Sequence, residues 1–90
     1  MLDKSHIKSL TVKEITEVLR EEGVSEPEVT GPEGLADLGL SSLVLARVLI
    51  GLEDVLGVDP FGGDLEDPDV RTVDDLADAY AHALERQETS

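Results

Sequence analysis

The chain has 90 residues and no cysteine, and its 21 Asp and Glu against seven Lys and Arg give a formal net charge of −14. This length makes one small domain with a modest core, and without cysteine neither disulfides nor thiolate metal sites can support it. So acidic a chain repels nucleic-acid backbones and anionic membranes and favours partners with basic patches, unless the acidity serves only solubility.

The first element predicted in chain order is a helix from Thr11 to Gly23. Thr11 and Glu14 have the spacing of a capping box, which marks a helix start, and Gly23 is a natural helix end. Apolar side chains recur between them with helical spacing, at Val12, Ile15, Val18 and Leu19. On this interpretation residues 1–9 precede the helix as a frayed end.

A long loop is predicted next, over residues 24–40. Its prolines and glycines leave no helical stripe of useful length. We expect three of its apolar side chains, Val29, Leu35 and Leu38, to turn inward against the helices.

The second helix is predicted to run from the serines at positions 41 and 42 to Gly57. Its helix propensity is high apart from Gly51, which costs about 1 kcal/mol relative to alanine. One apolar stripe has the spacing needed to pack against two other helices. It consists of Leu45, Val48, Leu49, Leu52 and Leu56.

A second apolar stripe follows the other side of this helix. Its members and their charged edge are Leu43, Val44, Ala46 and Ile50, with Arg47, Glu53 and Asp54. Either the helix is buried almost all round, or this stripe is an exposed face for partner proteins. We favour the partner face, because three helices can hardly surround the middle one. We expect partners to offer an apolar groove, with an acidic or neutral contact for Arg47.

Residues 58–71 are rich in Gly, Pro and Asp and are predicted to be a loop with room for one helical turn at 65–67. The acidic side chains of this loop do not have the spacing of an EF-hand. A solvated acidic cluster explains them better than a cation site, so no metal site is expected. They are Asp59, Asp64, Glu66, Asp67 and Asp69.

The last helix begins at a second capping pair, Thr72 and Asp75. Residues 86–90 are expected to fray. Its apolar stripe is formed by Val73, Leu76, Ala77, Tyr80, Ala83 and Leu84.

These elements predict an all-α fold, because no segment alternates long enough to be a strand. We expect one domain over residues 1–90, a bundle of three main helices with a long first loop and a short extra third helix. The N-terminus lacks the apolar stretch of a signal peptide, and no apolar run is long enough to span a membrane. A cytoplasmic monomer is therefore expected.

The two serines at the start of the second helix need separate explanations. Ser41 is a good N-cap, and Gly39 lets the chain turn tightly into it. These roles leave Ser42, in the first helical turn, without a structural function.

Catalysis by Ser42 itself is not supported, because a catalytic serine needs a base. Neither His6 nor His82 belongs to a nucleophile motif, and Leu43 stands where a G-x-S-x-G elbow has its final glycine. A phosphate ester is a better candidate, since the free N–H groups and the positive dipole end of a helix stabilise phosphate. A separate enzyme would carry out the transfer.

The stretch DLGLSSL, residues 37–43, resembles the attachment motif of acyl and peptidyl carrier proteins, commonly D-L-G-x-D-S-L. The resemblance extends over most of the chain, through the helix order, the segments LEDVLGVD and TVDDLADAY, and the acidity. It implies an acyl-carrier-like bundle that is not an enzyme. In that family the motif serine, here Ser42, carries covalent 4′-phosphopantetheine, whose thiol holds acyl or aminoacyl chains as thioesters. The matching residues are Asp37, Leu38, Gly39, Ser42 and Leu43.

Departures from the family pattern narrow the function that the resemblance implies. Ser41 replaces the usual aspartate, which keeps a cap but removes a charge. Val44 and Arg47 stand where fatty-acid carriers are commonly acidic, and only Glu53 and Asp54 remain acidic. This pattern is more similar to a discrete carrier of bacterial secondary metabolism, for polyketide or nonribosomal peptide antibiotics.

Such a carrier would meet three kinds of enzyme. They are a phosphopantetheinyl transferase, a loading enzyme (an adenylating ligase or an acyltransferase), and a downstream synthase or transferase. The second apolar stripe with its charged edge would be the docking surface. The alternative is an acidic helical protein-interaction domain that uses the same patch without a prosthetic group.

Overall fold

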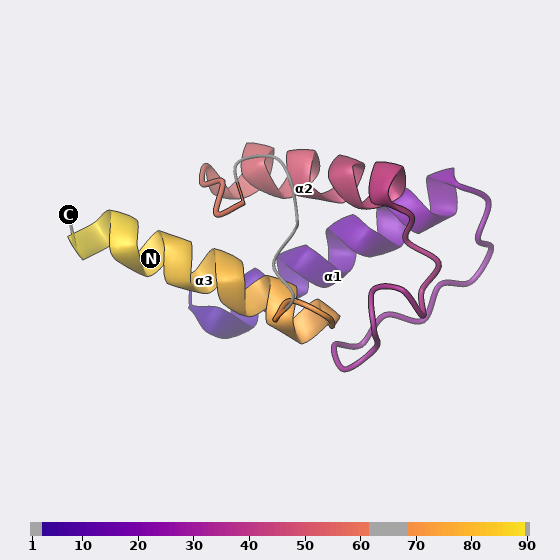
Figure 1. Cartoon of the computed structure of the whole chain (residues 1–90), viewed down its shortest axis with the longest axis horizontal. Coiled ribbons are helices and arrows are strands. Elements are labelled where there is room, and N and C mark those ends of the chain that lie inside the picture. Colours follow the sequence, from indigo (N-terminus) through magenta and orange to yellow (C-terminus); the bar gives the residue numbers. More distant parts are fainter. Residues whose placement is uncertain (1–2, 62–68, 90) are drawn as a thin grey trace.

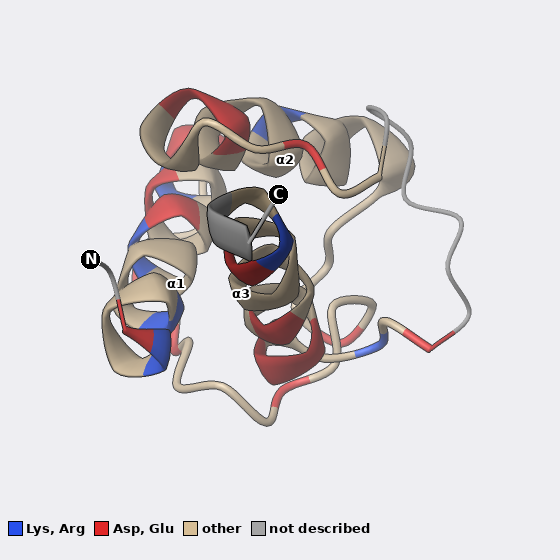
Figure 2. Ribbon diagram, turned by 90° about the vertical axis from the view of Figure 1, so that its left-hand side faces the viewer, with Lys and Arg blue, Asp and Glu red and all other residues tan. Residues whose placement is uncertain are grey.

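Three helices make up most of the chain that the structure describes. The computed structural model describes residues 3–61 and 69–89. These contain α1 (Lys4–Glu21), α2 (Ser42–Leu56) and α3 (Val73–Thr89). Figure 1 shows α1 running antiparallel to the other two helices, and seen from one end the three form a triangle (Figure 2). The predicted all-α bundle with a long first loop is confirmed.

The expected short third helix, at residues 65–67, lies outside the described ranges, as does most of the acidic loop. Within the described ranges, no group of acidic or histidine side chains is placed to hold a metal ion. None of the three described helices combines the length and apolar character that crossing a bilayer requires.

The first helix starts well before the predicted capping pair at Thr11. Asp3 caps it, because its side chain accepts the N–H of His6 at 2.8 Å. Thr11 is fully buried inside the helix, and its hydroxyl donates to the carbonyl of Ile7 at 2.8 Å. The predicted start was wrong because a threonine whose hydroxyl bonds back to residue i−4 is compatible with a helix interior. Residues 4–9 are therefore helical and not a frayed end.

The predicted end of α1 is confirmed. Gly23 donates its N–H to the carbonyl of Arg20 at 3.1 Å, and Val24 donates to Leu19 at 3.0 Å. This pair of bonds is the Schellman arrangement, which satisfies two of the last carbonyls of a helix. The first loop therefore leaves α1 in a defined direction.

The core lies between the three helices and includes part of the first loop. The apolar stripe predicted for α1 faces it, and so does that of α3, except that Ala81 is buried in place of the predicted Ala83. Four of the five stripe residues of α2 are buried, with Leu45 half-buried beside them. Leu35 is buried as predicted, and Val29 and Leu38 pack against the core from the loop. The buried hydrophobic residues are Ile7, Ile15, Val18, Leu19, Leu35, Leu40, Val48, Leu49, Leu52, Leu56, Val73, Leu76, Ala77, Tyr80 and Ala81.

Tyr80 joins α3 to α2 through the middle of this core. Its ring is fully buried and meets Phe61 edge-on, with 5.9 Å between ring centroids. Its hydroxyl donates to the carbonyl of Leu49 at 3.4 Å. Burial raises the pKa of the Tyr80 hydroxyl, and the charges of Asp59 and Glu53 add to the effect. The side chain is therefore neutral at physiological pH and contributes packing and one hydrogen bond.

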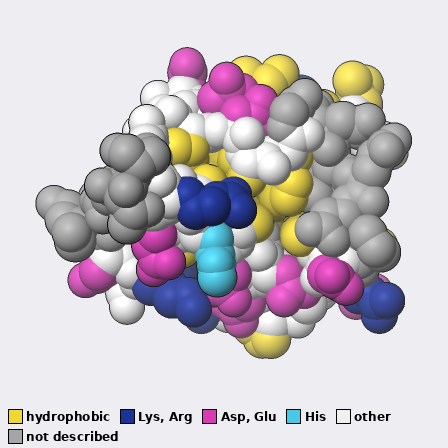
Figure 3. Space-filling view, turned by 60° about the vertical axis from the view of Figure 1, so that its left-hand side comes forward, with side chains coloured by type: hydrophobic (Ala, Val, Ile, Leu, Met, Phe, Trp, Pro, Cys, Tyr) yellow, Lys and Arg dark blue, Asp and Glu magenta, His cyan; other side chains and the backbone are white. Residues whose placement is uncertain are grey.

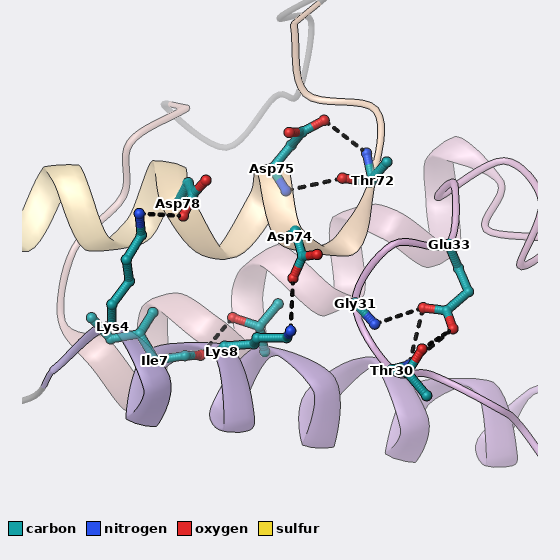
Figure 4. Close-up of polar contacts among 11 residues, drawn as sticks. Lys4, Ile7, Lys8, Thr30, Gly31, Glu33, Thr72, Asp74, Asp75 and Asp78 are labelled. Atoms are coloured by element: carbon teal, nitrogen blue, oxygen red, sulfur yellow. Dashed lines mark hydrogen bonds and ion pairs between the residues drawn. The ribbon is translucent and has the colours of Figure 1, made fainter.

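The predicted capping pair of α3 is confirmed (Figure 4). Asp75 donates its N–H to the Thr72 hydroxyl at 3.1 Å, and its carboxylate accepts the N–H groups of Arg71 and Thr72, both at 3.1 Å. These two backbone bonds lower the pKa of Asp75. The helix continues to Thr89. The expectation of a frayed end therefore fails for residues 86–89, because good helix formers such as Glu, Arg and Gln extend it.

The helices α1 and α2 approach each other closely at Gly51. A Cβ atom at this position would collide with the Glu14 carboxylate, so the missing side chain leaves room for that group. Partial burial raises the pKa of Glu14, and the carboxylates of Glu17 and Glu21 raise it further. The ionised form of Glu14 is therefore disfavoured where the two helices meet.

We expect Glu14→Gln to raise the melting temperature at pH 7. Because the folded-state pKa lies above the ordinary value of 4.5, the ionised carboxylate destabilises the fold above that raised pKa. This destabilisation falls as the pH drops through the raised pKa, and it is gone below 4.5. Thermal melts at pH 7 and at a pH below 4.5 measure the gain in melting temperature, which should vanish at the lower pH. Glu26→Gln, in the exposed loop, is the control and should show no gain. Equal melting temperatures for Glu14→Gln and the unaltered chain at pH 7 would contradict this account.

Candidate functional site

The start of α2 assigns different environments to its two serines. Ser41 is the N-cap, with extended backbone, and its Oγ accepts the N–H of Val44 at 3.3 Å. The Ser41 carbonyl accepts the N–H of Leu45 at 2.8 Å. Ser42 is the first helical residue and is exposed, and its hydroxyl makes no hydrogen bond with any described residue. Of the two hydroxyls, only that of Ser42 has no hydrogen bond with a described residue.

A tight turn over residues 34–40 delivers the chain to this helix start. Its backbone bonds join the N–H of Leu38 to the Gly34 carbonyl and the N–H of Gly39 to the Ala36 carbonyl, both at 3.1 Å. Gly39 has a φ of +79°, in the left-handed region that side chains with a Cβ disfavour. The buried side chain of Leu40 follows directly and fixes the turn to the core.

The same turn is bonded to the start of α3. Leu35 donates its N–H to the Arg71 carbonyl at 2.8 Å, and Gly34 and Thr72 form an isolated antiparallel bridge. The N–H groups of Val73 and Asp74 donate to carbonyls of the first loop at 3.1 and 2.9 Å. A helix start has free N–H groups, and here the first loop accepts two of them. The position of Ser42 therefore depends on α3.

Glu33 holds the middle of the first loop in shape, as Figure 4 shows. Its carboxylate accepts hydrogen bonds from the hydroxyl and N–H of Thr30 and from the N–H of Gly31. These bonds, the Thr30 hydroxyl first, lower the pKa of Glu33 to about 2. Gly31 lies directly over the ion pair of Lys8 and Asp74, where a Cβ would be 2.6 Å from an Asp74 oxygen. This role of Glu33 was not predicted, although the T-x-x-E spacing from Thr30 to Glu33 indicates such a bond.

No histidine is near Ser42. His6 lies in the first turn of α1 and His82 in the second half of α3, and both of these helix ends are opposite the start of α2 (Figure 1). The described part of the chain therefore offers no imidazole base for the hydroxyl. The start of α2 does offer the free N–H groups of its first turn and the positive end of the helix dipole. These groups fit a phosphate ester at Ser42.

The predicted docking residues do not all share one surface. Leu43 and Ile50 are 76% and 65% exposed, and Arg47, Glu53 and Asp54 are exposed as well. An α2 that is buried all round is therefore excluded. Val44 and Ala46 are half-buried, and Val44 packs against the core, because it lies on the side of α2 that turns toward α1. Val44 therefore offers less surface to a partner than Leu43 and Ile50 do, and its docking role stays a prediction. Val55, which lies outside the predicted stripe, is 55% exposed.

Arg47 has partners that the sequence did not indicate. Its guanidinium forms ion pairs with the carboxylates of Glu21 and Glu22, the latter at 2.6 Å. These residues are 26 and 25 positions away along the chain, so no local pattern relates them. Successive residues of a helix are about 100° apart, which places Arg47 and Ser42 about 140° apart around α2. Arg47 therefore faces α1 and not the side of α2 that carries Ser42.

Comparison with known proteins identifies one similarity. Residues 12–80 match the model of the family described as "Phosphopantetheine attachment site". The matched range contains most of α1, the whole first loop, all of α2 and the first half of α3. No curated protein and no solved structure matches the chain.

We expect Gly39→Ala to destabilise the fold by about 1–2 kcal/mol, because alanine is strained at this left-handed φ. An added Cβ would meet no atom within 4 Å, so backbone strain is the whole effect. Gly39→Asn should cost less, since asparagine tolerates this conformation better. Gly57→Ala, at the other end of α2 with a φ of +74°, is the matched control with a similar cost. Thermal melts measure all three, and a Gly39→Ala chain as stable as the original would show that the turn is not left-handed.

Proposed function

Because the chain belongs to the phosphopantetheine attachment site family, we propose that Ser42 is the residue to which the group is attached. The observation that supports this choice is the division of roles at the start of α2. The Ser41 hydroxyl is engaged as a helix cap, whereas the Ser42 hydroxyl is exposed and free. Ser42 also lies within the matched range and at the serine of the D-L-G-x-x-S-L pattern.

Membership of this family makes the protein a carrier and not an enzyme, and its cofactor is 4′-phosphopantetheine. When bound, this group supplies a terminal thiol that holds a cargo as a thioester. Neither His6 nor His82 lies near Ser42, so the described residues offer no imidazole base to its hydroxyl. The family match therefore favours a carrier over a helical interaction domain without a prosthetic group.

Attachment requires little chemistry from the chain itself. The bond that forms joins the Ser42 oxygen to the phosphorus of the pantetheine phosphate of coenzyme A. The bond that breaks is the phosphoanhydride to the adenosine part, which leaves as the second product. The hydroxyl proton must go to a base of the phosphopantetheinyl transferase. The free N–H groups at the start of α2 stabilise the new phosphodiester, an effect of about 0.3–1 kcal/mol at an exposed helix end.

We further propose that the cargo is an acyl or aminoacyl intermediate of polyketide or nonribosomal peptide biosynthesis, loaded by an adenylating ligase or an acyltransferase. Support comes from α2, where Val44 and Arg47 stand at positions that are commonly acidic in fatty-acid carriers, and where Leu43 and Ile50 expose apolar surface. Exposed apolar side chains of this size are typical of protein contacts. The carrier would present this face to the loading enzyme and to the downstream synthase or transferase.

We expect Ser42→Ala to abolish modification and to leave the fold intact, because an exposed first-turn position tolerates alanine. Ser41→Ala should still be modified, but should lose about 1 kcal/mol of stability with the cap. The measurement is the intact mass after incubation with coenzyme A and a transferase of broad carrier range, followed by peptide mapping. A group mapped to Ser41 would overturn the assignment.

We expect Ile50→Asp to slow thioester formation on the pantetheinylated carrier without unfolding it, because the side chain is largely exposed. Val55→Asp is the matched control, since it makes the same change at an exposed apolar residue about 140° away around the helix. It should load normally. Circular dichroism checks the fold of both variants. Normal loading of Ile50→Asp would show that this face of α2 does not contact the loading enzyme.

A further inference from the structure

The side chain of Arg47 reaches from α2 to the C-terminal end of α1. Its guanidinium lies between the carboxylates of Glu21 and Glu22. All three side chains are about half exposed, at 45%, 59% and 41%. A partner protein can therefore reach the two carboxylates, because the ion pairs lie at the surface.

These carboxylates are part of an acidic border along α2. Glu14 and Glu21 are seven residues apart and so lie on one face of α1, two turns from each other. Glu14 lies against Gly51 of α2, and Glu21 pairs with Arg47, one turn earlier in α2. This opposite order of contacts is that of two antiparallel helices. Leu43 and Ile50 lie on the exposed side of the same helix. Figure 3 shows hydrophobic and acidic side chains next to one another along the upper edge of the molecule, where α2 lies.

The border carries net negative charge despite Arg47. One guanidinium faces two carboxylates, which leaves one negative charge within this group of three side chains. Further along, the three carboxylates of Glu17, Glu21 and Asp54 raise the pKa of Glu14, and among the described residues the one cation that opposes them there is Lys13. The opposite side of α1 differs, because there each lysine has one aspartate. Lys4 pairs with Asp78 at 3.1 Å and Lys8 with Asp74 at 3.2 Å (Figure 4).

We infer that the docking surface for the phosphopantetheinyl transferase extends from the exposed face of α2 onto the C-terminal end of α1. There Glu21 and Glu22 meet a cationic side chain of the enzyme, next to the apolar contact at Leu43 and Ile50. Arg47 offsets one of the two negative charges and makes no contact of its own with the enzyme. This surface rests on the proposed carrier function.

Charge complementarity decides the sign of the partner's contact. The sequence predicted that a partner protein would offer Arg47 an acidic or neutral contact. In the structure two acidic contacts come from the chain itself, from Glu21 and Glu22. An acidic partner group would meet two carboxylates that already outnumber the guanidinium. A cationic group would be attracted, and such charges at the rim of an interface speed association and make it depend on salt.

Binding in the absence of chemistry tests this surface. In a Ser42→Ala background, calorimetry measures the Kd of the full chain for a broad-range phosphopantetheinyl transferase with coenzyme A, at about 50 mM and about 300 mM NaCl. The test variant is Glu21→Gln/Glu22→Gln. The matched control is Asp74→Asn/Asp78→Asn, which also removes two ion-paired carboxylates from the surface of the bundle. Arg47→Gln completes the set, and thermal melts confirm that every variant is folded.

We expect the Glu21→Gln/Glu22→Gln chain to bind several-fold more weakly at low salt and the difference to shrink at high salt. Arg47→Gln should bind as tightly as the unaltered chain or more tightly, and the control should not change. Equal binding by the test variant and the control would overturn the inference. An equal loss in Arg47→Gln would also overturn it, because Arg47 would then be a contact residue.

Modification of the unaltered chain separates this inference from the proposed function. If Ser42 accepts the group normally while Glu21→Gln/Glu22→Gln binds the transferase without loss, only the docking surface is wrong. If Ser42 does not accept it, the attachment proposal fails and the docking surface fails with it.

Discussion

The hydrogen bonds between the first loop and the start of α3 are the constraint on which the attachment end of the molecule depends. Leu35 donates to the Arg71 carbonyl, and loop carbonyls accept the first N–H groups of α3. These bonds serve both elements, because a helix start needs acceptors and a loop needs fixed partners. They place the turn at Gly39, and the turn places Ser42. A residue at the start of α2 is thus positioned by a helix that begins 31 positions later.

The helix start also explains why two adjacent serines differ. A helix has one N-cap, and Ser41 occupies it with its hydroxyl bonded back to the first turn. The next residue points its side chain outward beside the free N–H groups, where a phosphate is stabilised. On the proposed function, the carrier needs nothing else from its own chain at this point, because the phosphopantetheinyl transferase would bring the base. This division of work agrees with a family whose members carry a group and do not transform it.

The contact between α1 and α2 shows how the charge of this very acidic chain is distributed. The −14 net charge is not spread evenly around the bundle. Lysines and aspartates pair one to one between α1 and α3, whereas carboxylates exceed cations between α1 and α2. Gly51 gives Glu14 room there, and Arg47 draws in the two glutamates at the end of α1. The surplus lies beside the exposed apolar residues of α2, so charged and apolar side chains adjoin on one surface.

The sequence by itself determined the helical class, the bounds of α2, both ends of the first loop and the serine that caps α2. Periodicity, capping pairs and the helix-ending glycine are local signals, and the local hydrogen bonds that they predict at the helix ends are present. It misplaced the start of α1, because the Thr11 hydroxyl bonds within the helix as readily as at a cap. Only the tertiary structure decided that Val44 faces inward and that Arg47 is matched by Glu21 and Glu22. Both facts depend on how α1 packs against α2. A contact between residues about 25 positions apart produces no periodic pattern in the sequence, so the sequence could not predict it.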